Sequence, residues 1–255
     1  MTLVEVIDHG AVRELRLARP PVNALDPGLC SAIADAVGTA ARDGVRGLVL
    51  AGGPKVFSAG LDVPYLVSLG GDRATLRASW DAFFDAARAI AGARMPVVAA
   101  MAGHAPAGGC VLALCCDYRV MASGPFTIGL NETQVGLVAP DGIQHLLRRV
   151  VGAHRAERLL VAGTLVPADA ALAMGLVDEL VDIDHVAVRA KAWLLESLLA
   201  LPRGPMLETR RMARADLVAA LQPGRIELDR FIESWYSDDT QAALRALMAR
   251  LGKPL

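Results

Sequence analysis

The sequence lacks the features that mark several classes of protein. Its net charge is −1 and it has no long basic block, so we expect no nucleic acid or membrane partner. Its longest apolar runs are interrupted by Arg, Asp or Gly well before they reach membrane-spanning length. The opening residues, MTLVEVIDHG, have neither a basic start nor a long apolar core, so we expect no signal peptide.

Cysteine is scarce, and its spacing fits no metal site. Of the four cysteines, Cys110, Cys115 and Cys116 fall in one apolar segment without the spacing of zinc ligands, and Cys30 is remote in sequence. We therefore expect reduced thiols in the core and no bound metal. A cytoplasmic location follows from the same pattern.

Familiar catalytic motifs are also missing. Gly52-Gly53 is not followed by Gly-Lys-Ser/Thr, so it does not form a phosphate-binding loop. Ser58 does not stand in a G-x-S-x-G elbow, which argues against a serine hydrolase. His104 and His145 match no catalytic pattern, and we interpret them as surface or core residues. The chain shows no internal repeat and no low-complexity segment.

The sequence has enough apolar residues for a large core, and their pattern predicts an α/β fold. It has 255 residues, of which 54% are hydrophobic. Short apolar or alternating runs predict strands, and apolar residues at helical spacing predict helices between them. The predicted strands are 3–7, 12–17, 46–51, 97–101, 117–121 and 126–129, with a strand-like segment at 56–60. The predicted helices begin at Pro27, capped by Asp26, and continue at 64–93, 110–116, 142–151, 154–162 and 169–174.

The last part of the chain is predicted to be wholly helical. Residues 186–199, 205–221 and 226–250 carry apolar stripes that need partners, in the core or on a second subunit. We expect Leu228, Phe231, Ile232 and Trp235 to be buried. The predicted organisation is therefore a core at 1–185 and a helical region at 186–255 that packs on this core or on a neighbouring subunit.

The most informative stretch is 101–140, MAGHAPAGGCVLALCCDYRVMASGPFTIGLNETQVGLVAP. Gly108 and Gly109 precede an apolar helix, whose first N–H groups lack partners within the helix and attract a negative oxygen. Glycine here lets a ligand approach the backbone closely. Glu132 is the one charged residue in the segment 126–140. By residue type alone, a surface or helix-capping carboxylate remains the simpler interpretation of Glu132.

The motifs GHAPAGGC, CDYRV and IGLNETQVGLVAP resemble the crotonase superfamily, the enoyl-CoA hydratases and isomerases, and look most like the Δ3,Δ2-enoyl-CoA isomerases. The resemblance covers nearly the whole chain. It implies a spiral of ββα units with a helical C-terminal region, and assembly as a trimer or a dimer of trimers. It also implies a setting in fatty-acid β-oxidation and an acyl-CoA substrate with no separate cofactor, because coenzyme A is part of that substrate.

The same resemblance assigns roles to particular residues. The backbone N–H groups of Leu61 and Gly108 would form an oxyanion hole, and Glu132 would carry the proton. The segment 19–25 would lie beside the coenzyme A channel, and the helical region 64–93 would line the acyl pocket, with Trp80 and Phe84 as candidates. The implied substrate- and CoA-binding residues are Ser58, Ala59, Gly60, Asp62, Tyr65, Leu66, Gly109 and Val111.

Val111 is where the sequence departs from hydratases. By the motif alignment, a hydratase has its first catalytic glutamate at this position, and here the residue is aliphatic. With one carboxylate, proton shuttling is favoured over the activation of water. Two other hypotheses remain: another crotonase-type enzyme, such as a hydratase, acyl-CoA lyase or thioester hydrolase, and a protein that binds acyl-CoA without turnover. Glu132 argues against the second, and Val111 against hydratase chemistry.

Overall fold

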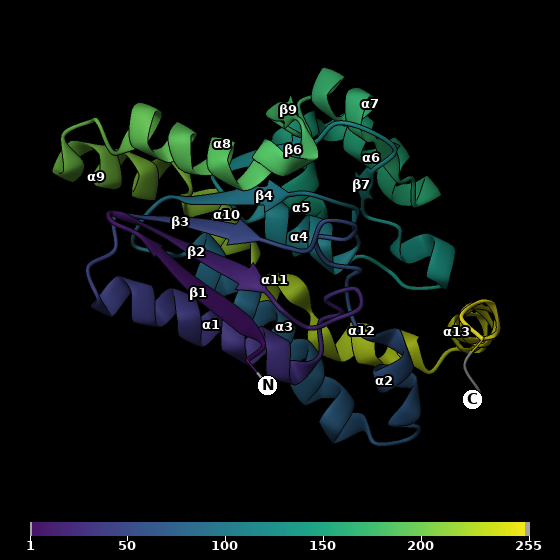
Figure 1. Ribbon diagram of the computed structural model, residues 1–255. Coiled ribbons are helices and arrows are strands. Elements are labelled where there is room, and N and C mark those ends of the chain that lie inside the picture. Colours follow the sequence, from purple (N-terminus) through teal and green to yellow (C-terminus); the bar gives the residue numbers. More distant parts are fainter. Residues whose placement is uncertain (1, 253–255) are drawn as a thin grey trace.

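The computed structural model describes residues 2–252, an α/β molecule built on one large twisted sheet (Figure 1). Its strand order is β1-β2-β3-β4-β6-β9, with β1 and β2 antiparallel and the rest parallel. A smaller sheet, β5-β7-β8, lies beside it. The strands are β1 (Val4–His9), β2 (Val12–Leu17), β3 (Gly47–Ala51), β4 (Val97–Met101), β5 (Ala105–Pro106), β6 (Tyr118–Ala122), β7 (Thr127–Gly129), β8 (Val166–Pro167) and β9 (Glu179–Val181).

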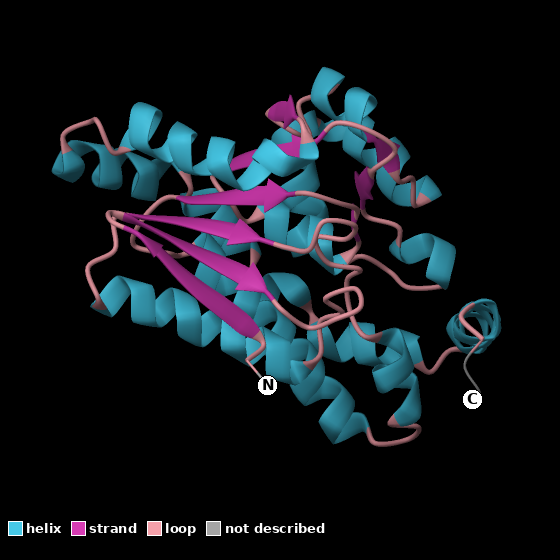
Figure 2. Cartoon of the chain, viewed as in Figure 1, coloured by secondary structure: helices cyan, strands magenta, loops and turns pink. Residues whose placement is uncertain are grey.

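Helices cover both faces of the large sheet, as the cyan ribbons of Figure 2 show. The helices of the first part are α1 (Pro27–Arg42), α2 (Val63–Ser68), α3 (Arg73–Ala91), α4 (Gly108–Leu114), α5 (Asp141–Val151), α6 (Ala153–Ala162) and α7 (Ala168–Ala173), with a 3₁₀ turn η1 (Glu132–Val135). Those that follow are a 3₁₀ turn η2 (Ile183–His185), α8 (Val186–Trp193), a π-helical turn η3 (Leu194–Leu198), α9 (Arg203–Ala213), α10 (Ala215–Ala220), α11 (Pro223–Ile226), α12 (Leu228–Trp235) and α13 (Asp238–Arg250).

The central strands are buried on both sides, which explains their continuous apolar sequence. All five residues of β3 and all five of β4 are buried. On one face, Leu48 and Leu50 join the main core, to which α1 and α3 contribute. On the other face, Val49 joins a smaller core formed with α8. The fold therefore confirms the predicted α/β class.

Local signals placed most elements correctly. The Asp26 side chain accepts a hydrogen bond from the Leu29 N–H at 2.8 Å, so it caps α1 as predicted, with Pro27 at the first helical position. The predicted burial in the C-terminal region is also confirmed, because Leu228, Phe231, Ile232 and Trp235 are all buried. The division at residue 185 stays a prediction, although the main core includes side chains from both sides of it.

Several predicted helices are broken in the structure. The helical region 64–93 divides into α2 and α3 at Gly70, whose φ is +55°, and Asp72 caps the second helix. The segment 205–221 is divided at Arg214, whose guanidinium turns inward to donate to the carbonyl of Cys115 at 2.5 Å. The segment 226–250 is interrupted at Glu227 (φ +48°) and again where Ser237 caps α13.

One predicted strand is absent. Within residues 2–252, the segment 56–60 forms only an isolated bridge between Val56 and His104. A Cβ on Gly103 would lie 2.2 Å from the carbonyl carbon of Lys55, so two loops cross closely here instead of continuing a sheet. This crossing brings the loop after β3 against the loop after β4.

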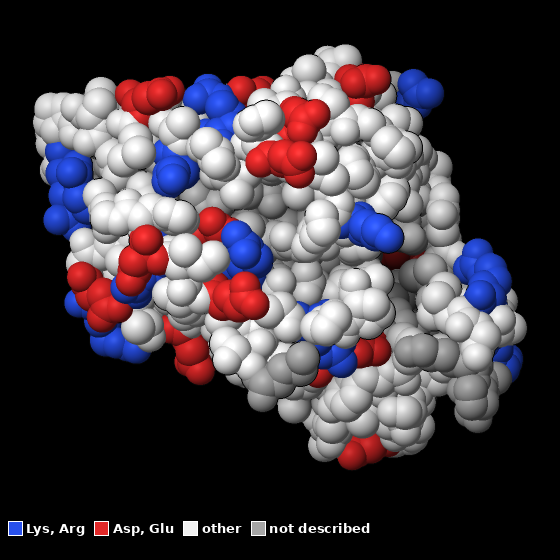
Figure 3. Space-filling model, viewed as in Figure 1, with Lys and Arg blue, Asp and Glu red and all other residues white. Residues whose placement is uncertain are grey.

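Charged side chains of both signs are interspersed on the face shown in Figure 3, in keeping with the net charge of −1. Among the described residues, no helix is long and apolar enough to cross a membrane.

Candidate active site

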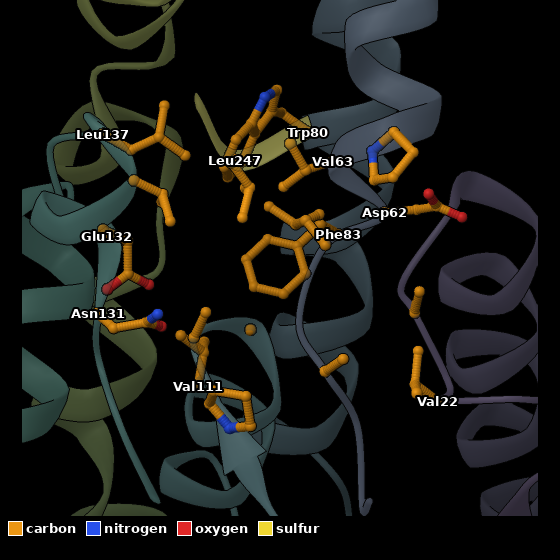
Figure 4. A pocket seen from close by; sticks show the side chains of 18 of the residues that line it. Val22, Asp62, Val63, Trp80, Phe83, Val111, Asn131, Glu132, Leu137 and Leu247 are labelled. Atoms are coloured by element: carbon orange, nitrogen blue, oxygen red, sulfur yellow. The ribbon is translucent and has the colours of Figure 1, made fainter. Parts of the chain in front are cut away.

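A cavity of about 640 Å³ lies where the loops after β3, β4 and β7 meet the C-terminal helices (Figure 4). Most of its lining is apolar. The lining residues are Arg19, Pro20, Pro21, Val22, Ala24, Ala59, Leu61, Asp62, Val63, Pro64, Trp80, Phe83, Pro106, Ala107, Gly108, Val111, Asn131, Glu132, Val135, Leu137, Val138, Pro140, Ile143, Phe231, Leu247 and Leu251.

One wall of the cavity presents two backbone N–H groups, those of Leu61 and Gly108. Neither donates to an acceptor within residues 2–252. Their segments are pressed together, because a Cβ on Gly60 would lie 2.9 Å from the Ala107 Cβ and 3.0 Å from the Gly108 nitrogen. Ala107 has a φ of +47°, a strained conformation for a residue with a side chain. Two unpaired donors, one in a loop and one at the N-terminus of α4, form a suitable cradle for a developing oxyanion.

Close packing and hydrogen bonds between buried side chains and the main chain hold this wall in place behind the amides. Gly109 cannot carry a side chain, because a Cβ there would lie 2.3 Å from the Ser58 carbonyl oxygen. The Ser58 hydroxyl, fully buried, donates to the Asn23 carbonyl at 2.8 Å and accepts from the Gly60 N–H at 3.2 Å. Asn23 in turn donates from its side-chain amide to the Phe57 carbonyl at 3.1 Å. These bonds fix the loop that carries the Leu61 amide.

The opposite wall carries the carboxylate of Glu132, the first residue of η1. Its Oε2 atom is buried and has no hydrogen-bond partner within residues 2–252. Burial raises the pKa of Glu132 from 4.5 to about 7 and outweighs the opposing effect of a hydrogen bond from its own backbone. At neutral pH the carboxyl group is therefore poised between its charged and neutral forms, as a group that both accepts and returns a proton requires.

Val111 and Asn131 flank this carboxylate. Figure 4 shows Asn131 beside Glu132 and Val111 below them, with all three at the edge of the same cavity. Val111 is fully buried in the first turns of α4, and Asn131 Oδ1 is buried with no partner in the described chain. The position at which a hydratase would carry its first glutamate therefore lines the same cavity as Glu132, and here it is apolar.

The other carboxylate in the lining, Asp62, has partners for both of its oxygens. Its Oδ2 lies 2.7 Å from Nη2 of Arg19, and its Oδ1 accepts the Tyr65 N–H at 3.1 Å as the cap of α2. Arg19 also pairs with Asp26 at 3.0 Å. In Figure 4, Asp62 points away from Glu132 on the far side of the cavity. Only Glu132, of these two acids, is free for proton transfer.

Comparison with known proteins identifies the scaffold that holds these groups. A family model described as Enoyl-CoA hydratase/isomerase matches residues 8–240. The chain belongs to the enoyl-CoA hydratase/isomerase family. This confirms the crotonase superfamily that its motifs predicted.

Relatives within this family carry both activities in their names. The mitochondrial enoyl-CoA delta isomerase 1 of Mus musculus is 33% identical over 98% of this chain and 86% of its own length. A Mycolicibacterium paratuberculosis protein named "Probable enoyl-CoA hydratase echA17" is 36% identical over 84% and 85%. The crystal structure of human mitochondrial delta3-delta2-enoyl-CoA isomerase superimposes with a TM-score of 0.91 at 32% identity, covering 98% of each chain.

The crotonase scaffold brings some of the predicted site residues to the cavity and leaves others outside it. Leu61, Gly108, Glu132, Ala59, Asp62 and Val111 line it, as do residues of the segment 19–25. Five predicted binding residues lie outside the lining: Ser58, Gly60 and Gly109, which shape the loops behind it, and Tyr65 and Leu66 on α2. The roles of all these residues in binding and catalysis stay predictions.

Several lining residues of this crotonase-type site were not found by sequence reasoning. In α2 the cavity is lined by Val63 and Pro64, two residues before the predicted pair. In α3 it is lined by the predicted Trp80, and by Phe83 instead of Phe84. Leu247 and Leu251 come from the end of the chain, and no local signal distinguishes them from core leucines. Asn131 was detectable, because it directly precedes the candidate base in the motif Asn131-Glu132-Thr133.

No group of three or more His, Cys, Asp or Glu side chains within residues 2–252 is arranged to hold a metal ion. The chemistry that these residues can support by themselves is proton transfer next to a stabilised oxyanion.

Proposed function

We propose that this family member is a Δ3,Δ2-enoyl-CoA isomerase, which moves the double bond of an acyl-CoA thioester from position 3 to position 2. The observation that carries the proposal is the single unpaired carboxylate of Glu132. It is buried in an apolar cavity with a pKa of about 7, and two free backbone N–H groups lie in another wall of that cavity. The similarity to proteins named as delta isomerases supports the same activity.

In this mechanism Glu132 acts first as a base. Its carboxylate takes a proton from C2 of the 3-enoyl thioester, and the electron pair of the broken C–H bond moves toward the thioester oxygen to form a dienolate. The amides of Leu61 and Gly108 donate hydrogen bonds to that oxygen. Oxyanion donors of this kind each lower the barrier by about 3–4 kcal/mol.

The neutral Glu132 then acts as an acid. Its proton is delivered to C4, the double bond forms between C2 and C3, and the carbonyl is restored, so the carboxylate is regenerated. A carboxyl group with a pKa near the working pH suits both steps, since neither form is strongly favoured. The apolar lining keeps water from the dienolate and strengthens the two amide bonds to it.

The second candidate is a hydratase, because some relatives carry that name. Hydration uses two carboxylates to orient a water molecule. The position that would carry a carboxylate in addition to Glu132 is occupied by Val111. Asp62, the other acid in the lining, is engaged by Arg19 and by the N-terminus of α2. The observations therefore favour isomerisation. Trimeric assembly and a cytoplasmic location stay predictions.

The test is an assay of the purified protein on 3-enoyl-CoA and on 2-enoyl-CoA, with isomerisation and hydration measured separately. We expect isomerisation of the first substrate and little or no water addition to the second. Efficient hydration of 2-enoyl-CoA without isomerisation would overturn the proposal.

A further inference from the structure

Glu132 lies on a turn of only four residues, η1, so its position depends on what holds that turn. Inside the turn, the Leu137 N–H donates to the Glu132 carbonyl at 2.9 Å, and the Gly136 N–H donates to the Thr133 carbonyl at 3.2 Å. On one side, α6 supports the turn, because the Thr133 hydroxyl donates to the Leu160 carbonyl at 3.2 Å. These bonds hold the turn that carries the Glu132 carboxylate on the side facing α6.

The other face is held by α13, more than a hundred residues later. The Thr240 hydroxyl donates to the Gly136 carbonyl at 2.6 Å, and Thr240 is only 4% exposed. Gly136 has a φ of +78°, and a Cβ on it would lie 2.5 Å from the Ala243 Cβ. Helix and turn are therefore in direct contact, with one buried hydrogen bond between them.

The same helix forms part of the cavity wall. Leu247, two turns after Thr240, points into the cavity in Figure 4, and Leu251 at the end of α13 also lines it. The start of α13 therefore contacts the turn that carries Glu132, and its end closes the space into which Glu132 faces. Displacement of α13 would both release the turn and admit water.

We propose that Thr240 is a positioning residue for the reaction, which holds α13 against η1 so that the Glu132 carboxyl stays aimed into a dry cavity. This inference rests on the proposed isomerase function. Thr240 does not line the cavity and acts through the Gly136 carbonyl. A displacement of about 1 Å in a catalytic group costs on the order of 10²-fold in rate, so one such hydrogen bond has a measurable effect.

The charged groups near η1 leave burial as the main influence on Glu132. The Cys110 thiol on α4 interacts with Glu132, but burial raises the pKa of that thiol, so it is neutral at working pH. Exposed charged or titratable groups on the two helices that pack against η1 are His154, Arg155, Glu157 and Arg158 on α6, and Asp238, Asp239, Arg245 and Arg250 on α13. Water entry after loss of the Thr240 bond is therefore expected to lower the pKa of Glu132.

The test compares Thr240→Val, which removes the hydroxyl at nearly constant volume, with Thr240→Ser, which keeps it. For the valine variant we expect kcat to fall about 10-fold or more, with KM changed less, and the acid limb of the kcat/KM profile to move to lower pH. The serine variant is expected to restore most of the activity and the original profile. A carbon-13 NMR titration of the Glu132 carboxyl gives the same pKa shift without relying on turnover.

The matched control is Ser79→Ala. Ser79 is 3% exposed, and its hydroxyl donates to the Thr75 carbonyl at 2.8 Å within α3, so this variant also loses a buried hydroxyl bond. If Thr240→Val loses stability like the control but keeps its kcat and the Glu132 titration, the positioning role is wrong. If the valine variant does not fold, Ala243→Val tests the same contact, and unchanged kcat and titration there overturn the proposal.

The test of Thr240 can be distinguished from the test of the proposed isomerase function. Absence of isomerisation by the wild-type protein contradicts the function, and the NMR titration still decides whether Thr240 controls the Glu132 environment. Isomerisation by the wild type with an unaffected Thr240→Val contradicts the positioning role alone.

Discussion

The two working walls of the cavity are built in opposite ways. The amide wall consists of main chain, and its segments lie so close together that a Cβ on Gly60 would be 2.9 Å from the Ala107 Cβ. The carboxylate wall consists of one side chain on a four-residue turn, held by hydrogen bonds to α6 and α13. The first wall depends on small residues at fixed places, and the second depends on helices that are distant in sequence. Substitutions at the two walls are therefore expected to reduce activity for different physical reasons.

The largest effect is expected at the carboxylate. Glu132→Gln keeps the shape of the side chain but cannot accept and return a proton, so we expect kcat to fall about 10²–10⁴-fold with acyl-CoA binding largely unchanged. Steady-state kinetics and calorimetric titration with a saturated acyl-CoA measure the two quantities. Glu233→Gln, at an exposed position on α12, is the control. More than about a tenth of wild-type kcat in the Glu132 variant would place the base elsewhere.

The next largest effect is expected at the amide wall. Gly60→Ala introduces a Cβ 2.9 Å from the Ala107 Cβ at a φ of +84°, so the Leu61 and Gly108 amides must separate. We expect kcat to fall about 10²-fold, the scale of one lost oxyanion donor. Gly10→Ala is the matched control, because Gly10 has a φ of +70° but open space around it. Equal behaviour of the two variants would mean that backbone strain, and not the amide geometry, causes the loss.

A smaller and more specific effect is expected at Val111, between the two walls. Val111→Glu places a second carboxyl group in the cavity, so we expect lower isomerase activity and a small hydratase activity on 2-enoyl-CoA. The gain is limited because no surrounding residues are arranged to hold that group. Stability is also expected to fall, since the side chain at this position is fully buried.

Val111→Gln has the same bulk without the charge and serves as the control for this change. Hydration that is equal in the two variants, or absent in both, would contradict our explanation of why the site isomerises.

The smallest effect concerns the stability cost of the carboxylate itself. The pKa of Glu132 is about 7 in the folded protein against 4.5 for the exposed group, so the folded state binds the proton more tightly. Compared with a Gln at this position, the stability that the protonated Glu132 contributes is fully present below pH 4.5. It is lost as the pH rises through about 7. We expect Glu132→Gln to exceed the wild type in stability by about 3 kcal/mol at pH 8, and the gap to close near pH 4. Denaturant unfolding at both pH values measures it, and a pH-independent gap would contradict the raised pKa.

The same contrast explains how far the sequence predicted the structure. The amide wall follows local signals: a glycine pair before an apolar helix, and a second glycine loop after a buried strand. The glycine pair located Gly108, the resemblance to crotonases assigned Leu61, and both residues line the cavity. The resemblance to crotonases supplied the architecture, which periodicity by itself does not provide.

The carboxylate wall was only partly predictable. Glu132 was found by its motif, but its contact with α13 joins Gly136 to Thr240, and no local pattern indicates such a pairing. The choice of Val63 over Tyr65 as a lining residue depends on where α2 begins. That start is set by the Asp62 cap and its pairing with Arg19, a contact between segments 43 residues apart.

The buried cysteines can report local unfolding of the core, because a thiol reacts only when it is exposed. Cys110, Cys115 and Cys116 are fully or almost fully buried on or just after α4, and burial raises the pKa of each thiol, so none is reactive while the fold is closed. Cys110 lies two residues after the Gly108 amide. The rate at which Cys110 is alkylated therefore measures how often the amide wall unfolds locally. The rate at Cys30, which is buried in α1, measures local unfolding in a remote part of the core.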